Sequence, residues 1–274
     1  MKTFFVLCFS LILFNCSKVE WGYKMAPRVL ANRIDDAFDF NSDRFNQVRN
    51  QLEADFKSNQ KELISMSVQQ IDTLLALSDK KDLSKADLKN NFENLQAAQK
   101  KIIYLFRPTF EKILNQLSDE EFKNLKKYAE EKFAETNTFL TSKEALSEKQ
   151  LKSFKDAMEF FFDQATDVQI GLYKTFAEKN YSFFVYQLSV RRDFMKNFEL
   201  RLPDKKELID YTLKYYSGDF SIRTDEHQKK QLAAAESFTD FEYQIWLSLT
   251  DKQKKYFKET LMSLKAEIER LSAT

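Results

Sequence analysis

Residues 117–133 read LSDEEFKNLKKYAEEKF, and this stretch decides the fold class. Its first residues carry the signal of a helix start. The Ser118 side chain can accept a backbone N–H three residues on while Glu121 reaches back, which forms a capping box. The apolar residues that follow are spaced along one helix face: Phe122, Leu125, Ala129 and Phe133. The stretch therefore predicts an amphipathic helix with a defined start.

The same signals recur along the chain. Further capping pairs are Ser147 with Gln150, Asp204 with Glu207, Thr239 with Glu242, and Thr250 with Gln253. From these starts and from apolar stripes we predict helices over residues 27–39, 42–77, 84–116, 118–139, 147–198, 204–217, 224–236 and 239–272. We also expect a kink at Pro108, a break near Gly171 or Asn180, a helix end just before Gly218, and a turn near Thr250.

The composition supports an all-α protein. Only three glycines and three prolines occur among 274 residues, too few for a β-protein with many tight turns. We predict an elongated bundle of about seven to nine helices, several of them long. They form one domain over residues 27–274, whose weakest seam lies at 218–223. Because 43 basic side chains nearly balance 42 acidic ones, the chain has no long-range attraction for nucleic acid, and we expect none as a partner.

The N-terminus carries a targeting signal. Lys2 precedes an apolar run, Phe4–Phe14, which is too short to cross a bilayer and has the layout of a secretory signal. The tetrad LFNC at 13–16 resembles the lipobox of bacterial lipoproteins, in which the cysteine is acylated and becomes the mature N-terminus. We expect residues 1–15 to be removed, Cys16 to be lipidated and residues 16–26 to form a tether to the membrane. An uncleaved anchor or a signal cut elsewhere is the alternative.

Several short units carry a family resemblance. RVLANRIDDAFDF (28–40) follows a stretch with Trp21 and Tyr23, and L-S-x-x-E/Q units occur at 117–121 and 146–150. A variant unit, FNSDRF (40–45), has Arg44 where glutamine is expected. With the lipobox, this pattern resembles a family of bacterial lipoproteins of unknown function, loosely over residues 16–192. The resemblance implies a lipidated, helical envelope protein without an assigned activity. Ser17 implies, by the sorting rules of enteric bacteria, an outer-membrane lipoprotein facing the periplasm.

The sequence has few of the residues that metal binding and nucleophilic catalysis commonly use. His227 is the only histidine, and of the two cysteines Cys8 falls in the signal and Cys16 would be blocked by lipid. We therefore expect no metal and no other cofactor. Neither a nucleophile elbow nor a glycine-rich phosphate loop occurs. We predict a protein that is not an enzyme. A hydrolase built on two carboxylates stays open, because 42 acidic residues always contain some pairs.

A candidate partner contact lies in residues 28–39. Its charged side chains are Arg28, Arg33, Asp35, Asp36 and Asp39, and its apolar side chains can pack on the bundle with the acidic face outward. A carboxylate cluster can hold Ca²⁺, but such sites usually also take backbone carbonyls from a loop. We expect these acids to be neutralised by the arginines nearby, Arg44 included.

The aromatic content gives a second candidate site. The chain has 27 phenylalanines, including Phe160–Phe162 and Phe183–Phe184, and consecutive aromatic side chains cannot all face one core. Burial between two helix layers is one explanation. The other is a groove for an apolar ligand with a basic rim, for which the candidate residues are Phe161, Phe184, Arg191 and Arg192.

Three functions follow from these observations. The first is a non-catalytic interaction or structural component of the cell envelope, anchored to the membrane through acyl chains and bound to a protein partner. The second is a carrier or adaptor that takes a lipid or another apolar ligand in the Phe-rich groove. The third is the carboxylate-based hydrolase.

Overall fold

The computed structural model describes residues 19–271, so that the predicted signal sequence and Cys16 lie outside the described residues. The described chain is helical throughout, without a strand, which confirms the all-α prediction. The number of helices was underestimated, because there are twelve α-helices and one 3₁₀ turn, η1 (Phe220–Ile222), between residues 19 and 271. The α-helices are α2 (Val19–Phe38), α3 (Ser42–Ser58), α4 (Gln60–Ser78), α5 (Lys85–Leu105), α6 (Arg107–Asn115), α7 (Asp119–Phe139), α8 (Lys143–Phe162), α9 (Asp167–Lys179), α10 (Tyr181–Leu200), α11 (Lys205–Tyr216), α12 (Asp225–Ser248) and α13 (Asp251–Arg270).

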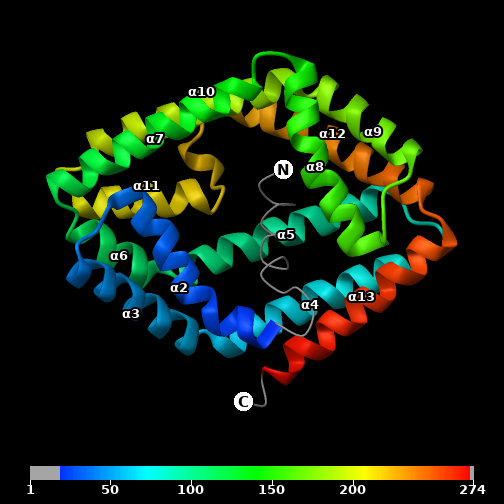
Figure 1. Ribbon diagram of the computed structural model, residues 1–274, viewed down its shortest axis with the longest axis horizontal. Helices are drawn as coiled ribbons and strands as arrows, with labels where there is room; N and C mark the ends of the chain where they lie inside the picture. The colour runs from blue at the N-terminus through cyan, green and yellow to red at the C-terminus, as the bar shows by residue number, and fades with distance from the viewer. Residues whose placement is uncertain (1–18, 272–274) are drawn as a thin grey trace.

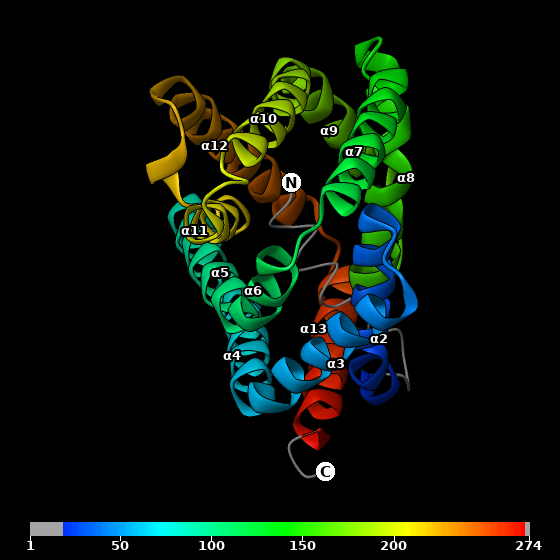
Figure 2. The same ribbon diagram turned by 90° about the vertical axis from the view of Figure 1, so that its left-hand side faces the viewer.

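Paired helices outline a ring when the molecule is viewed down its shortest axis (Figure 1). Helix α7 lies along α10, α9 along α12, and α4 along α13 (Figures 1 and 2). The ring closes where α13 meets α2 and α4: Val19 and Leu271 are buried in the same apolar cluster, and the Gln60 side chain donates a hydrogen bond to the carbonyl of Leu271 at 3.0 Å. The two ends of the described chain therefore lie together.

The apolar side chains form four separate clusters rather than one core. The largest joins α2, α3, α6, α10 and α11 around Leu208 and Leu213, which are fully buried. The second packs α13 against α4 and α8 around Leu261. Two smaller clusters lie between α8, α9 and α12. This arrangement follows from the ring, because each pair of helices buries its stripe against its own neighbours.

Several predicted spans are divided further. The span 42–77 breaks at Asn59, and the kink expected at Pro108 is a complete break at Phe106, with Pro108 in the first turn of α6. Proline fits there because the first N–H groups of a helix lack intrahelical partners. The span 147–198 breaks at 163–166 and at Asn180, whereas Gly171 lies inside α9. The turn near Thr250 and the helix end just before Gly218, which has a φ of +74°, are as predicted.

Three of the predicted helix starts are wrong, and the others hold. Ser118 and Thr250 form complete capping boxes. Helix α8 begins one turn before Ser147, with Ser142 as its cap. Thr239 lies inside α12, where its hydroxyl donates to the carbonyl of Ala235 at 3.0 Å instead of capping a helix. The first helix begins at Val19 and not near residue 27, so that residues 19–26 of the predicted tether are helical.

Candidate functional site

The predicted partner segment, residues 28–39, forms the second half of α2. Its Asp35 carboxylate accepts the backbone N–H of Phe40 at 2.9 Å, just past the point where Asp39 adopts a left-handed φ of +52°. Asp35 therefore stabilises the turn into α3. Arg28, Arg33 and Asp36 are exposed on the surface of α2, and Asp39 is exposed just after its last residue.

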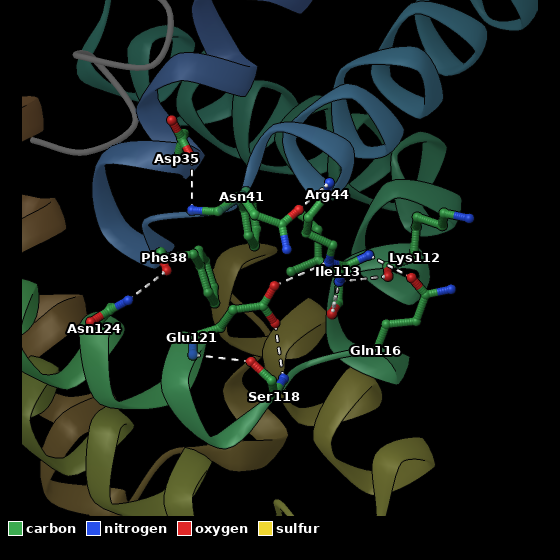
Figure 3. Close-up of polar contacts among 11 residues, drawn as sticks. Asp35, Phe38, Asn41, Arg44, Lys112, Ile113, Gln116, Ser118, Glu121 and Asn124 are labelled. Atoms are coloured by element: carbon green, nitrogen blue, oxygen red, sulfur yellow. Dashed lines mark hydrogen bonds and ion pairs between the residues drawn. The ribbon is translucent and has the colours of Figure 1, made fainter.

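Arg44 lies beside that turn at the centre of a buried group of polar contacts (Figure 3). Its Nη1 donates to the side chain of Gln116 at 2.7 Å. Its Nη2 donates to the carbonyls of Ile113 at 2.7 Å and Lys112 at 3.1 Å. Its Nε donates to the Glu121 carboxylate at 3.2 Å. Arg44 was expected to neutralise the acids of α2, and this is wrong, because its charge is paired with Glu121.

These contacts have a structural purpose. The two carbonyls belong to the last turn of α6, whose negative dipole end favours a cation. Glu121 also accepts the N–H of Ser118 in the capping box of α7, where an anion is favoured. Arg44 thus fixes α3 to the end of α6 and the start of α7. Its donors are engaged within the protein, so this group holds the fold rather than a ligand.

The predicted apolar-ligand residues do not lie together. Phe161 is buried in the second cluster, where it packs near Phe257 of α13. Phe184 packs instead against the third cluster, near Phe176 and Phe238. Arg191 and Arg192 are exposed further along α10, and the Arg192 guanidinium lies 5.7 Å from the ring centre of Phe133. Phe184 lines a small recess that opens beside a larger groove.

That groove lies where α9 passes into α10 beside α12, and we call it the α10–α12 groove. Its volume is about 500 Å³, and it is lined by Lys179, Asn180, Ser182, Phe183, Lys230, Ala233, Ala234, Glu236, Ser237 and Asp240. The sequence creates it in two ways. Asn180 alone separates α9 from α10, and the small side chains of Ala233 and Ala234 leave space on the side of α12 that faces it. The floor is fixed by a hydrogen bond of 2.9 Å from the Asn180 amide to the Ser237 hydroxyl.

Charges of both signs lie along the α10–α12 groove. Lys230 is paired with Glu226 at 3.1 Å and lies over the ring of Tyr186. Asp240 is paired with Lys85 at 2.6 Å, and this hydrogen bond raises the pKa of Lys85. Lys179 and Glu236 are exposed and form no ion pair with another residue of 19–271. The groove therefore offers one unpaired charge of each sign.

A smaller apolar recess continues from the groove. It holds about 50 Å³ and is lined by Phe176, Asn180, Phe183, Phe184, Gln231, Ala234, Ala235 and Phe238. Ligand pockets usually hold about 300–1,000 Å³, and a water molecule takes about 30 Å³ in the liquid. The recess can accept one small apolar group, such as the end of an aliphatic side chain, and not an acyl chain.

Sequence reasoning identified Asn180 as a break and Phe183–Phe184 as unusual, but it missed Lys179, Lys230, Glu236 and Asp240. The signal that points to them is the run AAAES at 233–237, because its small side chains leave space beside α12. No local pattern shows that this side faces Asn180, because the two segments are 57 residues apart.

Searches for similar proteins gave no match among protein-family models, curated proteins or solved structures. Among residues 19–271, no helix combines the length and apolarity needed to span a membrane. Within the same residues no three His, Cys, Asp or Glu side chains are grouped so that they could hold a metal ion.

Proposed function

We propose that this protein is a non-catalytic interaction component of the cell envelope, anchored through acyl chains on Cys16 and facing the periplasm from the outer membrane. Its task is to hold a segment of a protein partner in the α10–α12 groove. The observation that carries the proposal is this groove, with its fixed polar floor, small side chains, charges of both signs and apolar recess.

The groove favours a peptide segment for three reasons. Small residues such as Ala233 and Ala234 let another backbone approach closely, as they do between packed helices. Lys179 and Glu236 can pair with charges of either sign on the partner. The recess next to Phe183 can take one apolar side chain, and a single buried anchor often supplies much of the binding energy of an interface.

The other two functions receive less support. A lipid carrier needs an enclosed apolar cavity of several hundred Å³, and the apolar recess holds about 50 Å³. A carboxylate-based hydrolase needs two carboxyl groups on opposite sides of a substrate. In the α10–α12 groove Glu236 and Asp240 lie one turn apart on the same helix, and Asp240 is paired with Lys85.

The test is to fill the groove. Ala234→Trp places an indole across the groove and the recess, while Ala134→Trp makes the same change on an exposed position of α7. Both variants should reach the envelope and keep the melting temperature close to that of the unmodified protein. We expect a specific partner to be lost from affinity captures with Ala234→Trp and retained with Ala134→Trp. Equal recovery from the two variants would rule out the groove.

Two further measurements test the remaining parts of the proposal. Mass spectrometry of the mature protein should find Cys16 acylated, and an unmodified Cys16 would overturn the localisation. The acidic face of α2 remains a proposed second contact. If it binds the partner, Asp35→Asn with Asp36→Asn should lower partner recovery without changing the fold, since an asparagine at 35 can still accept the Phe40 N–H. Unchanged recovery would leave the groove as the single contact.

A further inference from the structure

One end of the molecule is built from three segments that are distant in sequence. These are the first turn of α2, the junction of α3 with α4, and the end of α13, which lie together at the end of the ring opposite α10 (Figures 1 and 2). We call this the anchor end. Trp21 lies there with 62% of its side chain exposed, five residues after Cys16.

The anchor end is held rigidly. The Tyr23 hydroxyl donates to the carbonyl of Phe56 at 3.1 Å, and the two rings meet edge to face. The Gln60 amide donates to the carbonyl of Leu271 at 3.0 Å. Val19 is buried with side chains of α4 and α13. The position of Trp21 is therefore fixed relative to the α3–α4 junction and to the end of α13.

Three basic residues are sequence neighbours of the residues that make these contacts. Lys57 follows Phe56, Lys61 follows Gln60, and Arg270 precedes Leu271. All three side chains are exposed, and none forms an ion pair with another residue of 19–271.

The acids near the anchor end are mostly neutralised. Glu20 pairs with Lys24 at 2.5 Å, and Glu269 lies 3.9 Å from Lys265. Glu267 is half-buried, and Asp55 is buried, where the N–H and the hydroxyl of Thr109 donate to its carboxylate. The exposed charges of these segments that lack an ion pair with another residue of 19–271 are therefore mainly cations, although the chain as a whole is almost neutral.

We propose that the anchor end binds the headgroup layer of the membrane, with Trp21 inserted at the interface and Lys57, Lys61 and Arg270 in contact with anionic phospholipid. This inference rests on the acylation of Cys16 in the proposed function. Five residues span at most about 18 Å, so that a lipidated Cys16 holds the Trp21 backbone within that distance of the acylated residue. Tryptophan favours this layer because its ring is apolar and its N–H is polar.

The orientation has a consequence for the partner site. With the anchor end on the membrane, α10 and the part of α12 beside it, which line the groove, lie on the far side of the ring from the bilayer (Figures 1 and 2). The acyl chains alone would leave the domain free to tumble about its tether. The additional contact through Trp21 and the three cations gives the domain one preferred orientation on the membrane. Each cation near an anionic surface strengthens binding by about five-fold.

The experiment measures the depth of Trp21 in the acylated full-length protein. Trp246→Phe leaves Trp21 as the single tryptophan, because the chain has two. The protein is reconstituted in vesicles of phosphatidylethanolamine and phosphatidylglycerol that contain lipids brominated just below the headgroup. We expect strong quenching of Trp21 fluorescence by the brominated lipid and weak quenching by aqueous iodide. The reciprocal variant, Trp21→Phe with Trp246 retained, should show no quenching by the lipid, since Trp246 is partly buried against Phe257 and is not part of the anchor end.

Charge reversal tests the cations. Lys57, Lys61 and Arg270 are changed together to glutamate, and the control makes the same change in net charge at three exposed lysines of α8 and α9, Lys152, Lys155 and Lys174. We expect the first variant to lose most of the Trp21 quenching by brominated lipid and the control to keep it.

Flotation separates the two proposals. Protein that floats with the vesicles while Trp21 remains accessible to iodide would overturn the membrane-facing orientation and leave the lipid anchor intact. Protein that does not float, with Cys16 unmodified, would overturn the anchor and the orientation with it. Equal quenching in the two charge variants would overturn the role of the cations.

Discussion

Arg44→Met is the substitution that tests most directly how the ring is held together. Methionine keeps much of the volume of the side chain but removes every donor, so that the effect comes from the polar contacts and not from a cavity. Four acceptors lose their donor: the carbonyls of Lys112 and Ile113, the side chain of Gln116, and Glu121.

The magnitude follows from burial. The side chains of the Arg44–Glu121 pair are 8% and 13% exposed. Removing one partner of such a buried pair lowers the free energy of unfolding by about 3–5 kcal/mol, because the other charge is left unpaired in a poorly solvated environment. Glu121 keeps its hydrogen bond with the N–H of Ser118, and Gln116 can turn to solvent, which limits the loss. We therefore expect the free energy of unfolding to fall by about 3–5 kcal/mol.

The assay is urea denaturation followed by far-ultraviolet circular dichroism, with Arg49→Met as the matched control. Arg49 lies on the same helix, and its Nε is 3.6 Å from the carboxylate of Glu53, whose side chain is 56% exposed, so that loss of this pair should cost only about 0–1 kcal/mol. Arg44→Met with Glu121→Gln should recover part of the loss, because the uncompensated charge is gone while glutamine can still complete the capping box. A cost for Arg44→Met as small as that of the control would refute the role assigned to Arg44.

The other predictions concern local sites. Ser142→Ala should lower the free energy of unfolding by about 1 kcal/mol, whereas Ser147→Ala should show no loss of a cap, and the reverse order in urea denaturation would mean that α8 begins later. Burial and the nearby Arg223 lower the pKa of His227. Because the folded state favours the neutral ring, stability should fall as the pH drops below about 6.5, and His227→Gln should reduce that part of the loss; identical pH profiles of the unfolding free energy would contradict this. Asp163 has a φ of +76°, which is strained for a residue other than glycine. Asp163→Gly should therefore raise the free energy of unfolding by about 1 kcal/mol and with it the melting temperature. A lower melting temperature would show that the ion pair of Asp163 with Lys252 outweighs the strain.

Helix content was predictable because it depends on local signals, and helix boundaries were less so. Ser118 and Ser147 stand in the same L-S-x-x-E/Q pattern, yet only Ser118 caps a helix. Ser142 offers a competing cap one turn earlier, and the longer helix buries Leu146, which is 4% exposed. Tertiary packing therefore chose between two local signals of similar strength. The break at Asn59 lacked the glycine that usually marks a helix end.

The candidate site depended on contacts between distant segments. Arg44 reaches acceptors 68 to 77 residues away, and its sequence neighbours suggested the acids of α2 instead. The α10–α12 groove likewise joins segments that no periodicity connects. Local patterns indicated which side chains were unusual, and the fold decided which of them face one another.

The central claim is that the α10–α12 groove holds a protein segment, and site-specific photocrosslinking in native envelopes tests it most directly. A photoreactive phenylalanine analogue replaces Ala234 in the groove or, as the control, Leu247, which is 58% exposed on the same helix. We predict one discrete adduct from position 234, identified by mass spectrometry as a peptide of a single partner, and none from position 247. A lipid adduct at position 234, or the same adducts from both positions, would contradict the claim.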